Sequence, residues 1–338
     1  MDVVVFPNDD NVLLLVPKQA GYFDKYRERP YHESLFRDIT RYLIEKSIIK
    51  GNIVDLGAWI GDNSAPWAKM KDHTVYAIDP SADNCNYISA IAKLNNLKNL
   101  KVIQSAISDK DEILSTNDNV EHAAFSQTNS GSTKVKSTSL DNLMRDHTIA
   151  DVDFIHLDVE GMELTVLKGA HKLIMRYRPI IVYEIHLTMG VDDNNEIVKL
   201  LKDSKYNIYL MNEVLPNCRP DCRNVLAIPV ERDDKIVDTL TQHLNTFDYV
   251  IAAHIRNRCE SIKFTNIHKA YQTFMYLQAS DLSCVLIRCS EREVLKSFGC
   301  RVNECVDFAR STNVRNDYFI EQFVVSHAEL YGIKPLLR

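Results

Sequence analysis

The sequence predicts an α/β fold with a mainly parallel sheet, and three observations support this class. Between residues 52 and 230, short apolar runs alternate with stretches of helical periodicity. The runs are nearly continuous in apolar residues, which is typical of strands covered by helices on both faces. The chain has 338 residues, 45% of them hydrophobic, which suffices for one large domain and a smaller one. Ligands of such sheets bind at the carboxyl ends of the strands, where we therefore expect the functional residues.

Residues 1–50 are predicted to form a hairpin followed by a helix. The runs VVVF and VLLLV flank the turn PNDDN, a pattern typical of two short antiparallel strands. Residues 33–49 carry apolar side chains at nearly helical spacing. This helix would lead directly into the first strand of the large sheet.

Residues 51–230 are predicted to form the main domain. Residues 115–139 are rich in Ser, Thr and Asn and favour a long loop with an edge hairpin, either a substrate-binding segment or a surface excursion. The expected strands are 52–57, 74–79, 100–108, 152–158, 179–185 and 223–230, and the expected helices start at 64 and span 82–97 and 162–176.

Residues 231–338 are predicted to form a small, mostly helical appended domain of unknown role. The helical patterns cover 267–279, 302–310 and 317–331, with Gly332 placed to end the last one, and a β-run covers 283–289. This segment carries no net formal charge. It is a candidate surface for a protein partner or for self-association.

Composition and charge disfavour several classes of protein. The formal net charge of −6 offers no basic field for nucleic acid. The first residues lack a signal-peptide pattern and no run of about 18 apolar residues occurs, so we expect a cytoplasmic protein without a membrane span. The pairs Cys218/Cys222 and Cys300/Cys305 lack the two-residue spacing of zinc knuckles, which favours reduced thiols and no structural zinc.

The segment from Asp55 to Gly61, DLGAWIG, joins a strand to a helix through a glycine turn. A helix N-terminus after such a turn is a general site for anions or nucleotides. The turn lacks the Lys-Ser/Thr of a phosphate loop and the third glycine of a dinucleotide site. A carboxylate at the strand end suits an ammonium group, and glycine permits close approach of a nucleoside. S-adenosylmethionine has both of these parts and no pyrophosphate.

Two further strand ends fit this ligand. Asp79 ends the second strand about twenty residues after the turn, where an acidic side chain can accept both ribose hydroxyls. Ser105 and Ala106 end the third strand and would lie beside the adenine. The three strand ends together predict one continuous cofactor trough.

The runs IVDLGAWIGDNSAPWA, AIDPSADN and, above all, VDFIHLDVEGMELTVLKGAHKLI resemble the FkbM family of S-adenosylmethionine-dependent methyltransferases. The resemblance covers residues 30–230 in outline and implies a class I methyltransferase fold, a Rossmann-like seven-stranded sheet whose last strand is antiparallel. It also implies O-methylation of a small molecule or a sugar. The family usually has Asn where this chain has Trp59. The cofactor residues that it implies are Asp55, Gly57, Ala58, Trp59, Gly61, Asp79, Pro80, Ser105, Ala106 and Asp158.

Methyl transfer to a hydroxyl needs a group that aligns the acceptor oxygen and removes its proton. Asp158, at the fourth strand end, is our first candidate base, with Glu184 and His186 at the fifth strand end as further candidates. Glu160 and Glu163 have an alternative role in capping the following helix. Carboxylates in this arrangement would also suit Mg²⁺, so dependence on a divalent metal stays open while no metal ligand is assigned.

Two other functions remain as alternatives. An RNA cap or ribose 2′-O-methyltransferase shares the fold, but such enzymes have Lys where the fifth strand of this chain ends in Glu184. A non-catalytic protein of the same fold could serve in an assembly, since fold alone does not establish function.

Overall fold

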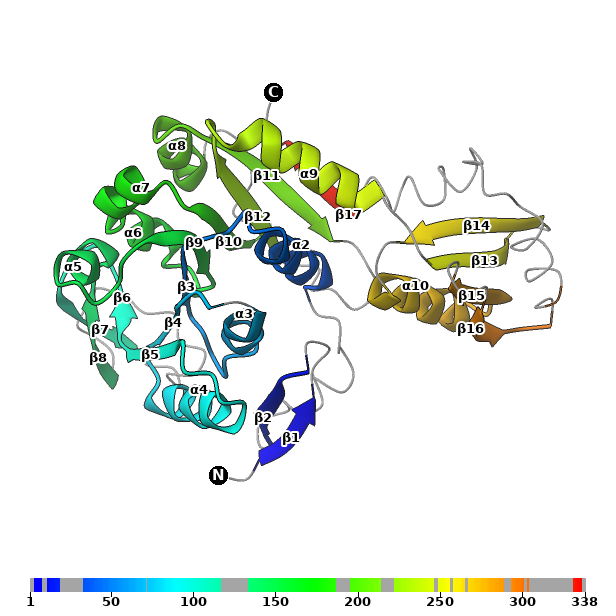
Figure 1. Cartoon of the computed structure of the whole chain (residues 1–338), viewed down its shortest axis with the longest axis horizontal. Coiled ribbons are helices and arrows are strands. Elements are labelled where there is room, and N and C mark those ends of the chain that lie inside the picture. The colour runs from blue at the N-terminus through cyan, green and yellow to red at the C-terminus, as the bar shows by residue number, and fades with distance from the viewer. Residues whose placement is uncertain are drawn as a thin grey trace.

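The computed structural model describes residues 3–7, 11–18, 33–70, 72–116, 133–186, 195–213, 222–245, 249–255, 258–264, 267–288, 293–300, 303 and 331–335. Most of the large domain is covered by these ranges, with helices on both sides of a twisted sheet (Figure 1). No helix within them is long and apolar enough to span a bilayer.

The large sheet has the strand order β17-β11-β12-β10-β9-β3-β4-β5. The five strands from β10 to β5 are parallel, and β12 lies antiparallel between β10 and β11. This agrees with the expected class I methyltransferase sheet of seven strands whose last strand is antiparallel, and the place of β12 between β10 and β11 is a finding of the structure. The strands are β3 (Asn52–Leu56), β4 (Val75–Asp79), β5 (Leu100–Gln104), β9 (Val152–Leu157), β10 (Ile180–His186), β11 (Tyr206–Glu213), β12 (Cys222–Pro229) and β17 (Tyr331–Pro335).

Strand β17 at the sheet edge was not expected. It pairs antiparallel with β11. The sequence indicated a helix over 317–331, but Tyr331 and Gly332 belong to this strand, and 317–330 lie outside the described residues. Pairing with an exposed edge strand overrides the local helical pattern there.

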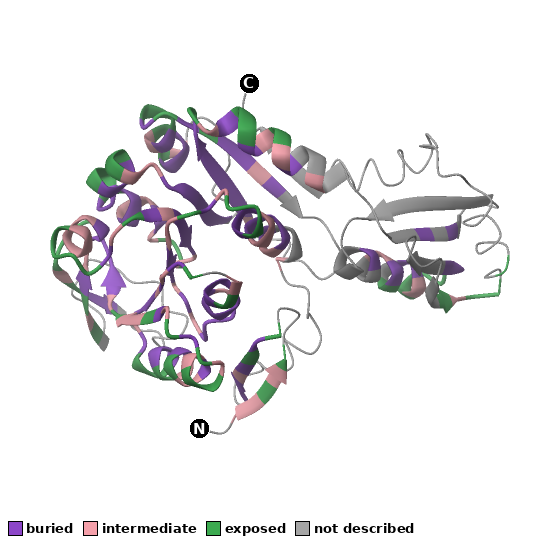
Figure 2. Ribbon diagram, in the orientation of Figure 1, coloured by how far each residue is buried: buried purple, intermediate pink, exposed green. Residues whose placement is uncertain are grey.

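Two hydrophobic cores lie on opposite faces of the sheet, which Figure 2 shows as buried strands between partly exposed helices. Neighbouring residues alternate between them, because Ile53 belongs to the first core and Val54 to the second. The first face is covered by α2 (Ser34–Glu45), α3 (Ser64–Met70), α4 (Ala82–Leu94) and α9 (Asp233–Asn245), and the second by α5 (Leu140–Arg145), α6 (Glu163–Lys168), α7 (His171–Tyr177) and α8 (Glu196–Asp203).

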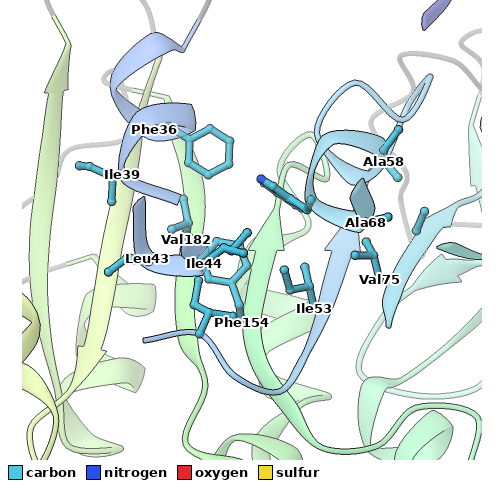
Figure 3. Packing of buried hydrophobic residues seen from close by; sticks show 14 of the residues in the cluster. Phe36, Ile39, Leu43, Ile44, Ile53, Ala58, Ala68, Val75, Phe154 and Val182 are labelled. Carbon is cyan, nitrogen blue, oxygen red and sulfur yellow. The ribbon is translucent and has the colours of Figure 1, made fainter. Parts of the chain in front are cut away.

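The expected N-terminal hairpin and helix are present. Strands β1 (Val3–Pro7) and β2 (Leu13–Pro17) pair antiparallel, and β2 packs beside α4. Helix α2 places Phe36, Ile39 and Leu43 in the first core, against Phe154 and Val182 of the sheet (Figure 3). The first turn of α2 therefore lies near the carboxyl ends of the strands.

The predicted helix over 162–176 is divided into α6 and α7 at Gly169. A Cβ at this position would lie 2.3 Å from the backbone oxygen of Ser108. The close approach of the chain after β5 thus interrupts the helical pattern. The expected edge hairpin is present as β7 (Glu112–Thr116) and β8 (Thr133–Thr138), which form a small sheet with β6 (Ala106–Ile107). The interior of the predicted loop lies outside the described residues.

The expectation of a mostly helical C-terminal segment is corrected. Four strands form an antiparallel sheet of order β14-β13-β15-β16, with the predicted helix α10 (Ile267–Ala279) beside it. The segment also contributes α9 and β17 to the large domain. The helix expected over 302–310 lies almost wholly outside the described residues. The strands are β13 (Tyr249–Ile255), β14 (Arg258–Phe264), β15 (Cys284–Arg288) and β16 (Glu293–Phe298).

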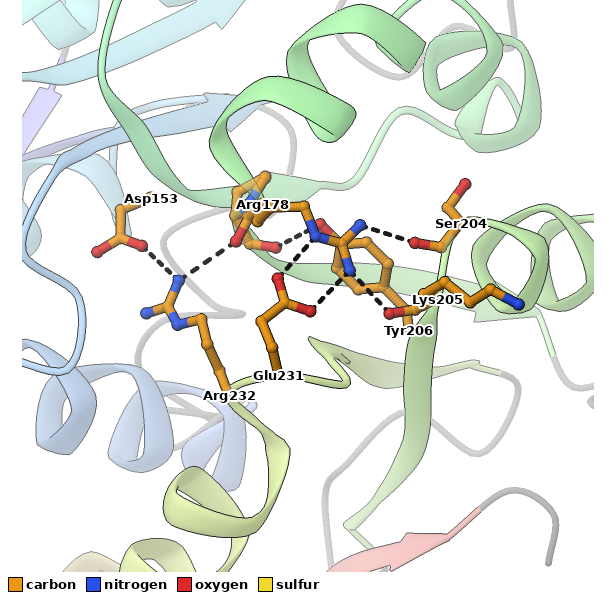
Figure 4. Close-up of polar contacts among 8 residues, drawn as sticks. Asp153, Arg178, Ser204, Lys205, Tyr206, Glu231 and Arg232 are labelled. Atoms are coloured by element: carbon orange, nitrogen blue, oxygen red, sulfur yellow. Dashed lines mark hydrogen bonds and ion pairs between the residues drawn. The ribbon is translucent and has the colours of Figure 1, made fainter.

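The amino ends of the parallel strands are held by a network around Arg178 (Figure 4). Its guanidinium group donates to both carboxylate oxygens of Glu231, at 2.8 and 3.0 Å, and to the backbone oxygens of Ser204 and Lys205. Arg232 donates to Asp153 at 2.6 Å. These charged groups bind one another. The candidate site lies at the opposite ends of the strands, the carboxyl ends.

Candidate functional site

The glycine turn after β3 has a defined backbone geometry. Gly57, Trp59 and Gly61 all have positive φ, at 73°, 47° and 81°. The backbone nitrogens of Gly57 and Ala58 donate to the oxygen of Ile78 in β4, and that of Gly61 donates to the oxygen of Ala58. The turn is thus tied to the carboxyl end of the neighbouring strand.

Position 57 requires glycine because the chain segments that follow β3 and β9 approach each other closely there. A Cβ on Gly57 would lie 1.8 Å from the backbone oxygen of Asp158. The Asp158 nitrogen donates to the oxygen of Leu56 at 3.0 Å, which draws the chain after β9 against the turn. Two of the sequence-predicted residues, Gly57 and Asp158, are therefore direct neighbours.

Asp55 lies under the turn and is 1% exposed. One carboxylate oxygen accepts a hydrogen bond from the Ser64 hydroxyl at the start of α3, and the other lies 2.8 Å from Nδ1 of His156. Both oxygens are engaged with the protein. This arrangement fixes the turn from below, and the predicted contact of Asp55 with an ammonium group stays a prediction.

Asp79 lies beside the turn, as expected. Its Oδ2 accepts from the backbone nitrogen of Trp59 at 2.9 Å, and its Oδ1 accepts from the Ser81 nitrogen and the Asn84 amide. A carboxylate has about four acceptor positions, so the remaining capacity is on Oδ2. Burial raises the pKa of Asp79 to about 6, against the lowering effect of these hydrogen bonds. Asp79 can accept one further hydroxyl directly.

The other residues expected near the cofactor follow the same strand ends. Pro80 follows β4 directly. Ser105 follows β5, and its backbone nitrogen donates to the oxygen of Asp79 at 3.1 Å. Ala106 is buried in β6, and Ala58 is buried in the turn. The ends of β3, β4 and β5 thus lie side by side, as the predicted trough requires.

Asp158 and Glu184 meet at the ends of β9 and β10. The parallel register pairs Tyr183 with Leu157, so Glu184 and Asp158 occupy the next position along both strands. Burial and the neighbouring charge of Glu184 raise the pKa of Asp158 well above its ordinary value. A carboxylate with a raised pKa is a stronger base than an ordinary one, which suits Asp158 to accept a proton from a substrate.

Glu163 takes its alternative role in the turn before α6, whereas a capping role of Glu160 stays a prediction. Oε1 of Glu163 accepts from the backbone nitrogens of Val159 and Gly161, both at 3.2 Å. Glu160 is exposed and has φ of 50°. Glu163 therefore stabilises the start of this helix, while both charges contribute to the raised pKa of Asp158.

His186 is the last residue of β10, and its side chain lies outside the described part of the structure. Among the described residues, no group of three or more His, Cys, Asp or Glu side chains is arranged to hold a metal ion. Cys85, Cys284 and Cys300 are free thiols.

Sequence reasoning missed His156, Asn224 and Glu33. His156 pairs in register with Asp55, and Asn224 pairs with Glu184. The amide of Asn224 donates to Glu33, just before α2, at 2.6 Å. A polar residue inside an apolar strand, as in IHL and RNVL, is the signal that could have identified the first two. Glu33 offers no such signal, because its position depends on the packing of α2.

Residues 55–208, just under half of the chain, match the family model described as the methyltransferase FkbM domain. No curated protein matches the chain in sequence. These matched residues contain the glycine turn, Asp79 and the Asp158–Glu184 pair.

Solved structures show weaker likenesses. The methyltransferase FkbM from Methylobacillus flagellatus KT is 19% identical with a TM-score of 0.38, over 52% of this chain and 43% of that one. The aligned part thus spans less than half of that protein. Precorrin-6y C5,15-methyltransferase from Geobacter metallireducens GS-15 is 12% identical with a TM-score of 0.33, over 56% and 87%. M. jannaschii TYW2, solved in complex with AdoMet, is 14% identical with a TM-score of 0.33, over 67% and 84%.

Proposed function

We propose that the protein is an S-adenosylmethionine-dependent O-methyltransferase acting on a hydroxyl of a small molecule or sugar, because residues 55–208 match the family model described as the methyltransferase FkbM domain. The observation that carries the proposal is that three features meet at the carboxyl ends of the parallel strands. They are the turn at Gly57, the carboxylate of Asp79 and the acidic pair of Asp158 and Glu184.

In this proposal the ends of β3, β4 and β5 hold the methyl donor. Gly57 and Gly61 keep side chains out of the turn, so that a nucleoside can approach the backbone. Asp79 accepts one ribose hydroxyl through Oδ2, while Trp59 holds the carboxylate in place through its backbone nitrogen. Asp55 supports the turn through Ser64 and His156. S-adenosylmethionine, when bound, supplies an electrophilic methyl group.

Asp158 is the proposed general base for the acceptor. It accepts the hydroxyl proton as the acceptor oxygen becomes nucleophilic. Glu184, one strand further from the turn, keeps the pKa of Asp158 raised through its charge. His186 ends the same strand as Glu184 and remains a further candidate base.

Binding experiments distinguish this proposal from the two alternative functions. A ribose 2′-O-methyltransferase would bind RNA with an affinity that falls steeply with salt. Glu184 is buried beside Asp158, and a carboxylate offers no contact to an RNA phosphate. This position therefore argues against a ribose 2′-O-methyltransferase. A non-catalytic protein of this fold would show no affinity for the methyl donor.

Calorimetry with S-adenosylmethionine and S-adenosylhomocysteine tests the donor site. We expect saturable binding to the wild-type protein and at least tenfold weaker binding to Asp79→Ala, since a hydrogen bond to a charged group contributes about 1.5–3 kcal/mol. Asp83→Ala, an exposed acid in the next helix, is the control and should bind as the wild type does. Absence of binding at high micromolar donor would favour the non-catalytic alternative.

Donor affinity should also depend on pH through Asp79. Its pKa of about 6 means that the carboxylate is ionised at pH 7.5 and mostly protonated at pH 5. If only the ionised form accepts the ribose hydroxyl, the Kd for S-adenosylhomocysteine should rise by about tenfold from pH 7.5 to pH 5. Asp79→Asn cannot titrate and should show a flat profile. The same profile in both proteins would assign the pH dependence to another group.

A further inference from the structure

A row of polar side chains extends from the glycine turn across the ends of three strands. Gly57, Asp158 and Glu184 follow one another along it, and Asn224 of β12 is the register partner of Glu184. Register partners project from the same face of a sheet. Neighbouring strands are roughly 4.8 Å apart, so the backbone positions of Asn224 and Asp158 lie roughly 10 Å apart, a separation that one sugar ring can bridge with a hydrogen bond of about 2.8 Å at each end.

Asn224 has an unusual environment in this row. The residue is 6% exposed, and its Oδ1 has no hydrogen-bond partner among the described residues. The orientation of the amide is fixed, because its Nδ2 donates to Glu33 at 2.6 Å and the flipped amide would bring two oxygens together. Leaving a buried acceptor unpaired costs about 1–3 kcal/mol, so Oδ1 needs a donor from outside this set.

The neighbours of Asn224 are also hydrogen-bond acceptors. Glu33 accepts from its amide, Glu184 lies opposite on β10, and Asp158 follows on β9. The charges of Glu33 and Glu184 both act on Asp158. A ligand hydroxyl can donate to the Oδ1 of Asn224, whereas a phosphate or carboxylate placed here meets the negative charges of Glu33 and Glu184.

We propose that Asn224 is a specificity residue of the acceptor subsite, whose Oδ1 accepts a hydrogen bond from a second hydroxyl of the acceptor while the reacting hydroxyl lies at Asp158. The subsite takes neutral acceptors with at least two hydroxyl groups on one ring and rejects their phosphorylated forms. This inference rests on the proposed function, because it assigns the acceptor side of the same site.

Saturation-transfer NMR on the full chain with saturating S-adenosylhomocysteine tests the inference. The probes are the methyl glycosides of glucose, mannose and galactose, together with glucose 6-phosphate. We expect saturation transfer to at least one methyl glycoside and none to the phosphate. Asn224→Ala should weaken binding of that glycoside by tenfold or more and leave the Kd for S-adenosylhomocysteine unchanged.

Asn207→Ala is the matched control. Its amide also donates to a carboxylate, that of Asp233 at 2.7 Å, but at the amino ends of the strands. This variant should bind the glycoside as the wild type does. The inference is overturned if no methyl glycoside binds, if glucose 6-phosphate binds as well, or if Asn224→Ala retains full affinity, as it would where Oδ1 only holds a water molecule. If the wild-type protein does not bind S-adenosylhomocysteine, the proposed function itself is rejected.

Discussion

Replacing Gly57 by alanine is expected to destabilise the protein by about 3–5 kcal/mol, because it combines a steric clash with backbone strain. The added Cβ would lie 1.8 Å from the backbone oxygen of Asp158 and 2.8 Å from its carbonyl carbon. Backbone atoms at the end of a central strand cannot move away as a flexible side chain does. The φ of 73° adds a conformational cost for any residue with a Cβ. Thermal unfolding should show a decrease in Tm of roughly 6–10 °C, at about 2 °C per kcal/mol for a unit of this size.

Gly161→Ala separates the clash from the strain. Gly161 also has a positive φ, of 94°, but a Cβ there would have no atom within 4 Å. We expect a loss of about 1–2 kcal/mol from backbone strain alone. If both variants lose the same stability, the strand ends separate to admit the methyl group, and the contact between Gly57 and Asp158 does not limit the fold.

The central sheet was predictable because its strands are buried on both faces. Runs such as NIVDL and VDFIHL are mostly apolar, and helical periodicity between them indicates parallel connections. The structure confirms the parallel strands and the antiparallel direction of β12, whereas the strand order was not predicted. The formation of an edge strand or of a break in a helix depends on which other parts of the chain lie against it. Strand β17 and the division of the helix at Gly169 therefore required the three-dimensional contacts.

The candidate site was predictable as a set of strand ends, but the partners of each side chain were not. Trp59 illustrates the difference. The family resemblance indicates Asn at this position, and the structure gives a reason, because the residue has φ of 47°, where Asn is tolerated better than Trp. Asp55 was expected to face the ligand, and only its contacts with Ser64 and His156 indicate a supporting role.

His156→Leu is expected to cost about 3–5 kcal/mol, since it leaves Asp55 buried without its partner. The side chains of His156 and Asp55 are 4% and 2% exposed, and Nδ1 lies 2.8 Å from the carboxylate. The imidazole also stacks on Phe36, with ring centroids 4.7 Å apart, and contacts the edge of Trp67. Leucine fills much of this volume but offers no hydrogen bond. Urea unfolding of both proteins measures the difference.

His243→Leu is the matched control, because His243 has the same two kinds of contact nearer the surface. Its Nε2 lies 3.2 Å from Asp38, its ring stacks on Tyr42, and the two ionisable side chains are 17% and 8% exposed. We expect a loss of about 1 kcal/mol there, since water partly replaces the lost partner. Equal losses in the two variants would mean that burial of the Asp55 carboxylate adds nothing to the cost.

The loss caused by His156→Leu should depend on pH in a defined direction. Burial lowers the pKa of His156, but the hydrogen bond and the charge of Asp55 raise it, and the net shift is upward. A histidine with a raised folded pKa contributes stability that is complete below its unfolded pKa of about 6.5 and is lost as pH rises through the folded pKa. The difference between wild type and variant should therefore be larger at pH 6 than at pH 9. A difference that increases toward pH 9 would mean that His156 is neutral in the folded protein and acts only as a hydrogen-bond donor to Asp55.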